Sequence, residues 1–116
     1  MRTFTGHTSH VYRLILLENG DLVSGSQDKT IKIWDTKDGT VKRTITGHSN
    51  YFFILKALDN GDLVSGSTDR TMKIWNVEDG SLKKSITANS PIYSLELLEN
   101  GDLVTGCLNG TIKIWE

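Results

Sequence analysis

The sequence predicts an all-β fold built from three copies of one short unit. The segment Glu18–Ser26 returns as Asp59–Ser67 and again as Glu99–Cys107, at offsets of 41 and then 40 residues. Within each copy, short runs of alternating apolar and polar residues are bounded by turn residues, and no stretch shows a sustained helical period. We therefore expect one segment, residues 1–116, with repeats near 2–42, 43–83 and 84–116.

The first hairpin of each copy is marked by an Asn-Gly pair. In the first copy, Asn19-Gly20 separates a predicted strand over Val11–Leu17 from one over Asp21–Ser26. Asn-Gly is typical of a two-residue type I′ turn, because that turn needs positive φ at both central residues. The same pair recurs as Asn60-Gly61 and Asn100-Gly101.

Two further turn signals complete the unit. Asp28-Lys29 leads into a predicted strand over Thr30–Trp34, and Asp38-Gly39 turns the chain into one over Val41–Thr46. Four short strands joined by tight turns predict an antiparallel meander. The equivalent positions in the later copies are Asp69-Arg70, Asn109-Gly110, Asp79-Gly80 and Leu82–Thr87.

Two dipeptides recur in register with these strands. Gly6-His7 is followed by Trp34-Asp35, and Gly47-His48 by Trp75-Asn76; a Ser-Gly-Ser-x-Asp motif places its Asp six residues before each Trp. On these residues the sequence resembles WD-repeat β-propellers over essentially its whole length. The resemblance implies three four-stranded antiparallel blades per chain, arranged radially around a channel. The last copy ends at the third strand and so lacks its outermost strand.

The resemblance also implies a structural hydrogen-bond network in each blade, formed by a histidine, a hydroxyl residue, an aspartate and a tryptophan. A buried indole N–H needs such a partner. The third copy has asparagine at both the histidine and the aspartate positions, so we expect it to be the least rigid. The three sets are His7, Ser24, Asp28 and Trp34; His48, Ser65, Asp69 and Trp75; and Asn89, Thr105, Asn109 and Trp115.

Two chemical alternatives use the same residues. Ser24, His7 and Asp28 are the ingredients of a hydrolase triad, but the set is repeated and has no nucleophile elbow. His7 with His10 is a two-histidine metal fragment without a third ligand. We therefore predict no catalytic residues, no metal and no cofactor, and keep the hydrolase as a remote alternative.

The resemblance places a partner-binding surface on the loops at the rim of the channel. Several of the corresponding residues are aromatic, and exposed aromatic side chains often dominate binding energy. Tyr12 or Phe53 could equally alternate inward and pack between blades, because a bulge makes strand phase hard to predict. The expected loop-face residues are His10, Tyr12, Gln27, Tyr51, Phe53, Thr68, Pro91, Tyr93 and Leu108.

Three blades are too few to close a ring, since closed propellers have at least four. An open arc would expose apolar faces and strand edges at both ends. We therefore expect a cyclic homo-oligomer, a six-bladed dimer or a nine-bladed trimer, with the dimer slightly favoured because its rotation per blade departs less from that of a seven-bladed ring. The alternative is a fragment or an engineered part of a longer propeller. The closure residues would be Arg2, Thr3, Phe4, Thr5, Ile114 and Trp115.

Composition limits the remaining functions. With 13 basic and 14 acidic residues in 116, the chain has no positive excess for nucleic acid or anionic membranes. The apolar run Tyr51–Leu55 is too short to cross a bilayer, and a single cysteine, Cys107, fits a reducing compartment. We expect a soluble, cytoplasmic, non-catalytic scaffold that binds itself and another protein or peptide, or a self-assembling unit with no ligand of its own.

Overall fold

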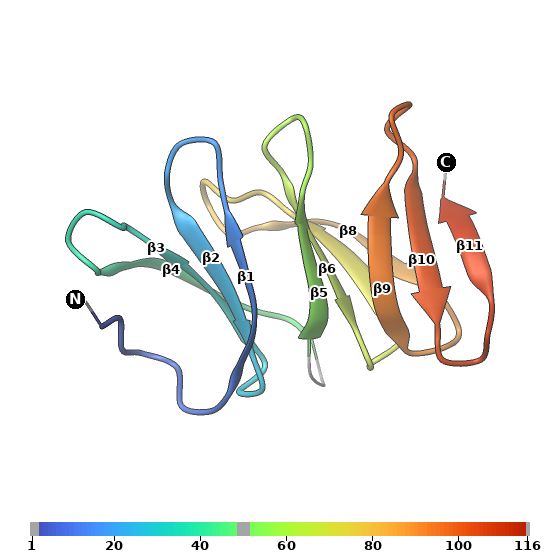
Figure 1. Cartoon of the computed structure of the whole chain (residues 1–116), viewed down its shortest axis with the longest axis horizontal. Coiled ribbons are helices and arrows are strands. Elements are labelled where there is room, and N and C mark those ends of the chain that lie inside the picture. Colours follow the sequence, from blue (N-terminus) through green and yellow to red (C-terminus); the bar gives the residue numbers. More distant parts are fainter. Residues whose placement is uncertain (1–2, 49–51, 116) are drawn as a thin grey trace.

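Three antiparallel sheets lie side by side in the computed structural model, which describes residues 3–48 and 52–115. The first sheet contains β1 (Val11–Leu16), β2 (Leu22–Ser26), β3 (Thr30–Trp34) and β4 (Val41–Thr46), paired in that order. Figure 1 shows the first and third sheets at opposite ends of the row and the second between them. The described part of the chain contains no helix long and apolar enough to cross a membrane.

The second sheet repeats the order of the first, and the third is shorter. The second consists of β5 (Phe52–Ala57), β6 (Leu63–Ser67), β7 (Thr71–Trp75) and β8 (Leu82–Thr87). The third has three strands within the described residues, so four strands per copy holds only for the first two sheets. These three strands are β9 (Ile92–Leu97), β10 (Leu103–Cys107) and β11 (Ile112–Trp115).

The Asn-Gly hairpins are not the two-residue type I′ turns that the sequence suggested. Only Gly20 has positive φ, at 92°, and Asn19 does not. The amide of Gly20 donates to the carbonyl of Leu17 (3.0 Å), and the amide of Leu17 donates to the carbonyl of Asp21 (2.9 Å). This is a three-residue loop in which a type I turn is followed by a left-handed glycine. The second and third copies have the same loop.

The hydrophobic core lies between the sheets. The central sheet contacts both neighbours, because β5 packs against β1 on one side and β9 on the other. Between the first and second sheets, Val23, Ile31 and Ile33 join a buried cluster with Leu55 and Trp75. A second cluster joins the second and third sheets, so both faces of the central sheet are covered. Its buried members are Val64, Met72, Ala88, Ile92, Leu95 and Leu103.

The two outer faces of the row are apolar and uncovered. Leu14 on the first sheet is 60% exposed, whereas Leu55 and Leu95 at the equivalent positions are 4% and 3% exposed. On the third sheet Ile112 is 77% exposed, whereas its equivalents Ile31 and Met72 are wholly buried. The same sequence positions are therefore core residues wherever a neighbouring sheet covers them.

Candidate functional site

The first sheet brings together the four residues of its predicted network. The Nδ1 atom of His7 lies 2.9 Å from a carboxylate oxygen of Asp28, and its Nε2 atom lies 2.5 Å from the hydroxyl oxygen of Ser24. The indole N–H of Trp34 donates to the same hydroxyl oxygen at 2.8 Å. With Asp28 ionised and accepting from Nδ1–H, Nε2 accepts the proton of Ser24. The chain of bonds then runs from the indole to the carboxylate.

Asp28 is the anchor of this network because it accepts from several donors at once. The backbone amide and hydroxyl of Thr30 donate to one carboxylate oxygen at 2.9 and 2.5 Å, and the amide of Thr8 donates to the other at 3.1 Å. Burial alone would raise the pKa of Asp28. The hydrogen bonds from Thr30, His7 and Thr8 outweigh it and hold this pKa well below its ordinary value.

The second sheet repeats the arrangement with deeper burial. Nδ1 of His48 lies 2.8 Å from a carboxylate oxygen of Asp69, and Nε2 lies 2.6 Å from the hydroxyl oxygen of Ser65. The indole of Trp75 donates to Ser65 at 2.8 Å. The side chain of His48 has no exposed surface, and this burial lowers its pKa despite the opposing effect of Asp69.

The third sheet keeps only part of the network. The indole of Trp115 donates to the hydroxyl of Thr105 at 3.0 Å, and Asn109 accepts from the hydroxyl of Thr111 at 2.6 Å. Asn89 is exposed, has φ at 63°, and is not bonded to either residue within the described chain. Instead, the buried hydroxyl of Ser90 accepts the amide of Asn109 at 3.2 Å.

Each network also includes a threonine, two residues after the turn Asp or Asn, that the predicted sets do not contain. Thr30, Thr71 and Thr111 each donate through the hydroxyl to the residue that begins the turn. The Asp-x-Thr or Asn-x-Thr spacing recurs in all three copies and would have identified it. This threonine fixes the acceptor in place.

The geometry of Ser24 opposes its use as a nucleophile. Ser24 is 2% exposed, its hydroxyl oxygen already accepts from Trp34, and its proton is committed to His7. A triad serine must reach a substrate carbonyl beside oxyanion donors. Both ring nitrogens of His7 are occupied as well, so the ring has no nitrogen left to share with His10 in binding a metal.

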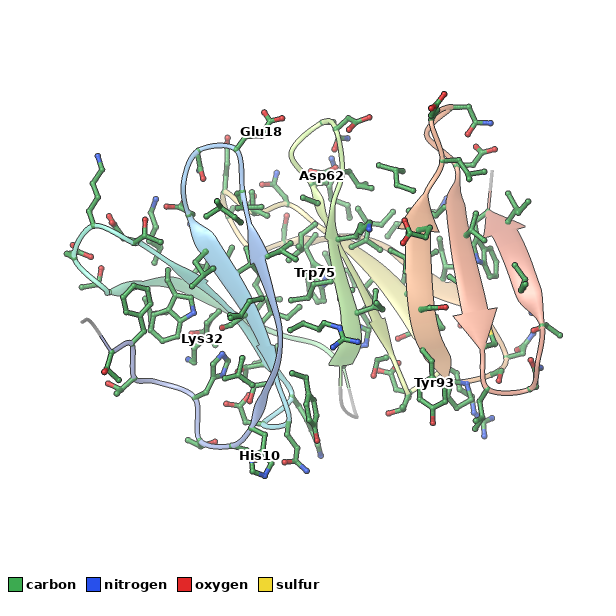
Figure 2. The ribbon with its side chains drawn as sticks, in the orientation of Figure 1. His10, Glu18, Lys32, Asp62, Trp75 and Tyr93 are labelled. Atoms are coloured by element: carbon green, nitrogen blue, oxygen red, sulfur yellow. The ribbon has the colours of Figure 1, made fainter. Side chains whose placement is uncertain are left out.

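Those predicted loop-face residues that the structure describes lie along one edge of the sheets. Figure 2 shows His10 and Tyr93 at this edge and Glu18 and Asp62 at the opposite edge. The amide of Gln27 donates to the carbonyl of His10 at 2.7 Å, and the amide of Leu108 donates to that of Pro91 at 3.0 Å. At this edge, the residue before the first strand of a sheet is therefore hydrogen-bonded to the residue that follows its second strand. Thr68 is half-buried; Tyr51 and the side chain of Phe53 lie outside the described part of the structure.

A β-bulge recurs at the aromatic position of this edge. The pairing of β1 with β2 skips Tyr12 between Val11 and Arg13, and the pairing of β9 with β10 skips Tyr93 in the same way. Tyr93 is 42% exposed and Tyr12 is half-buried. Bulges turn a side chain away from the regular alternation of a strand, often beside a functional site.

The predicted closure residues that the structure describes lie in the first and third sheets, at the two ends of the row. Phe4 packs on Trp34 with 5.6 Å between ring centroids, while Thr3 and Thr5 are exposed and outside any strand. Ile114 is exposed, but Trp115 faces the neighbouring sheet, packing against the second core cluster. Arg2 lies outside the described residues.

Comparison with known proteins gives matches along the whole chain. The family model described as "WD domain, G-beta repeat" matches residues 1–35, 38–76 and 80–116. The E3 ubiquitin-protein ligase TRAF7 of Mus musculus is 57% identical over 35 residues, which are 29% of this chain and 6% of the ligase. The Homo sapiens TRAF7 protein matches at the same identity over 5% of its length.

Solved propeller structures superpose closely on the chain. The crystal structure of the WD40 beta propeller domain of Doa1 has a TM-score of 0.94 at 38% identity, covering 100% of this chain and 40% of that one. The C-terminal WD40 domain of Sif2 has a TM-score of 0.87 at 21% identity, over 97% and 33% of the two chains, and it shows the fold alone. The chain therefore spans less than half the length of either structure.

Proposed function

The chain belongs to the family of WD domain, G-beta repeat proteins, and from this premise we propose that it is a non-catalytic scaffold that binds a protein or peptide on its loop face. Propeller domains of this family are generally interaction scaffolds. The match to TRAF7 is confined to 35 residues, so no ligase activity is carried over. A reducing, cytoplasmic location is part of the proposal, supported by the single Cys107.

The recurring bulge is the observation that carries the loop-face proposal. It presents an aromatic residue at the same point of the first and third sheets, Tyr12 and Tyr93, and Leu108 is exposed at this edge of the third sheet, where its amide donates to Pro91. Aromatic and apolar side chains on an open edge suit a peptide that is held through its own side chains, because backbone groups at this edge are already bonded within the sheet. The same edge holds His10 and Gln27, which would add polar contacts at the rim.

Panning a peptide display library against the chain tests this surface. Peptides that bind the loop face should bind Tyr93→Ala at least tenfold more weakly. They should bind Glu99→Ala normally, because Glu99 lies in a hairpin at the opposite edge. A panel of recovered peptides indifferent to Tyr93→Ala, Tyr12→Ala and Leu108→Asp would contradict the proposal.

Self-assembly is the second part of the proposal. Leu14 and Leu16 on one end and Ile112 and Ile114 on the other are large apolar side chains exposed on sheet faces. A monomer rarely keeps such faces in water, and a head-to-tail contact between copies would cover both ends at once. A six-bladed dimer or a nine-bladed trimer would result, and pairing of residues 2–5 with β11 would complete the three-stranded sheet.

The mass in solution, measured by light scattering across a size-exclusion peak, tests the assembly. The expected result is two or three times the chain mass of 12.9 kDa. Deleting residues 1–5 should weaken or abolish the assembly. A folded species of 12.9 kDa at every concentration would overturn self-assembly, although it would leave the peptide-binding proposal standing.

A further inference from the structure

The most exposed large hydrophobic residue of the described chain is Ile112, on the outer face of the third sheet. Its equivalents sit in the two internal interfaces. Ile31 is buried with Leu55, Leu63 and Trp75 of the second sheet. Met72 is buried with Leu95 and Leu103 of the third sheet, with Trp115 packed against the same cluster. The chain thus packs this residue twice against the same set of positions on the following sheet.

The first sheet carries that same set of positions on its outer face, where Phe4 packs on Trp34 but no further sheet of the described chain covers them. Leu14, Leu22 and Trp34 are equivalent to Leu55, Leu63 and Trp75. Together with Phe4 and Val11 they line a cavity of about 260 Å³ that opens on the outer face of the first sheet. Its polar floor, His7 and Ser24, is already satisfied by internal hydrogen bonds. Apart from Thr5 and Ser9, which are exposed, the remaining side chains of the lining are apolar.

We propose that the Ile112 side chain of one copy inserts into the Phe4–Val11–Leu14–Leu22–Trp34 cavity of a second copy. This inference rests on the proposed self-assembly and names the contact that produces it. The cavity is large enough for a branched aliphatic side chain, because one of roughly 150 Å³ already holds benzene. Ile114 follows Ile112 on the same face of β11, as Ile33 follows Ile31 on β3 and Ile74 follows Met72 on β7.

The backbone is also shaped for this contact. A Cβ built on Gly66 of the second sheet would lie 3.0 Å from a methyl group of Ile92, so the two sheets approach closely at that glycine. Gly106 has the equivalent place on the third sheet, where a Cβ would meet the hydroxyl of Ser94 in the same sheet and nothing from a further sheet of the described chain lies against it. Val11 has the place of Ile92 on the first sheet and is 47% exposed. A second copy would bring Val11 against Gly106.

The partner that fills this cavity is a second copy of the chain, because the two ends of the row are complementary in shape and chemistry. One end presents the side chains that the internal interfaces bury, and the other end presents the cavity that receives them. A face-to-face dimer would place Ile112 against Ile112 or one cavity against another, and neither arrangement occurs between the sheets of this chain. The repeat therefore favours a head-to-tail contact.

Single substitutions that place a charged side chain at either end of the row test the contact. Ile112→Glu and Leu14→Glu should each reduce the light-scattering mass to one chain, at concentrations where the unaltered protein is assembled. Both residues are exposed within a single chain, so the circular dichroism spectrum should not change. Leu82→Glu is the matched control: Leu82 is 47% exposed on β8 of the central sheet and should leave the mass unchanged. Ile112→Ala removes the side chain without adding charge and should also weaken assembly.

Mixing the two charged variants separates the possible arrangements. In a head-to-tail contact, Leu14→Glu still offers an intact Ile112 and Ile112→Glu still offers an intact cavity, so the mixture should recover a species of two chains. A face-to-face contact would leave one of the two variants assembled on its own.

The outcomes distinguish this inference from the proposed assembly. If the unaltered chain is assembled but Ile112→Glu and Leu14→Glu are assembled equally well, the contact is wrong and self-assembly stands. If the two variants are monomeric and their mixture stays monomeric, the head-to-tail arrangement is wrong. If the unaltered chain is itself a monomer, both proposals fail.

Discussion

Lys29 and Arg70 hold backbone conformations that side chains with a Cβ rarely adopt, with φ of 72° and 75°, at the position where the third copy has Gly110. Left-handed backbone costs a non-glycine residue about 1–2 kcal/mol. Lys29→Gly should therefore stabilise the chain, by up to about 1 kcal/mol after the greater freedom of glycine in the unfolded state is subtracted.

Urea unfolding checks this prediction. The midpoint of Lys29→Gly should rise with an unchanged slope, and the reverse replacement, Gly110→Lys, should lower the midpoint. Lower stability for Lys29→Gly would mean that the exposed lysine contributes a contact larger than its backbone strain.

The histidine of the second network should make the free energy of unfolding fall as the pH is lowered. The pKa of His48 is lowered from 6.5 in the folded chain, chiefly by burial. As the pH falls through 6.5, the unfolded chain therefore gains a proton at this residue before the folded chain does. The contribution is fully present above 6.5 and is lost as the pH falls toward the folded pKa.

We expect His48→Asn to flatten the dependence of unfolding free energy on pH between about pH 7 and about pH 5. The variant should also lose about 1–3 kcal/mol at neutral pH, because Ser65 and Asp69 each lose a buried partner. Chemical denaturation at several pH values measures both effects. Parallel pH curves for the two proteins would show that His48 does not titrate differently on folding.

The networks show what the sequence can and cannot predict about single residues. His7, Ser24 and Trp34 were predictable because their spacing recurs in the second copy. Asn89 was assigned to the third network by the same spacing, but the segment after it is one residue shorter and its backbone adopts positive φ. A deletion changes the path of a loop, and sequence alignment alone does not give that path.

Among the elements, strands were easier to predict than turns. The predicted bounds of Thr30–Trp34 and Val41–Thr46 agree with β3 and β4, because alternation and repetition both mark them. The Asn19-Gly20 turn was predicted with the wrong loop length, since Asn-Gly fits both a two-residue turn and a type I turn with a following glycine. The bulge at Tyr12 could not be placed from the sequence, because Leu14–Leu17 is apolar throughout and alternation therefore does not fix the phase of this strand.

The third sheet should be the least stable element. It has three strands within the described residues, one uncovered face, and neither a histidine nor an aspartate in its network. In the unassembled chain, native-state hydrogen exchange should therefore be faster for the amides of β10 and β11 than for those of β2, β3, β6 and β7. The chain supplies its own control, because these strands are equivalent in sequence. Equal protection in all three sheets would indicate that the end face is covered in solution.

For the whole molecule, the decisive property is that its two ends are built from core positions. Ile112 and Leu14 differ from Ile31 and Leu55 only in having no neighbouring sheet. If a second copy supplies that sheet, unfolding releases chains from an assembly, and stability depends on protein concentration by mass action. The thermal midpoint of the unaltered chain should therefore rise over a hundredfold increase in concentration. Ile112→Glu, measured in parallel, should keep a constant midpoint near the dilute limit of the unaltered chain. A midpoint of the unaltered chain that stays fixed over the same range would mean that its folded state does not depend on contact between copies.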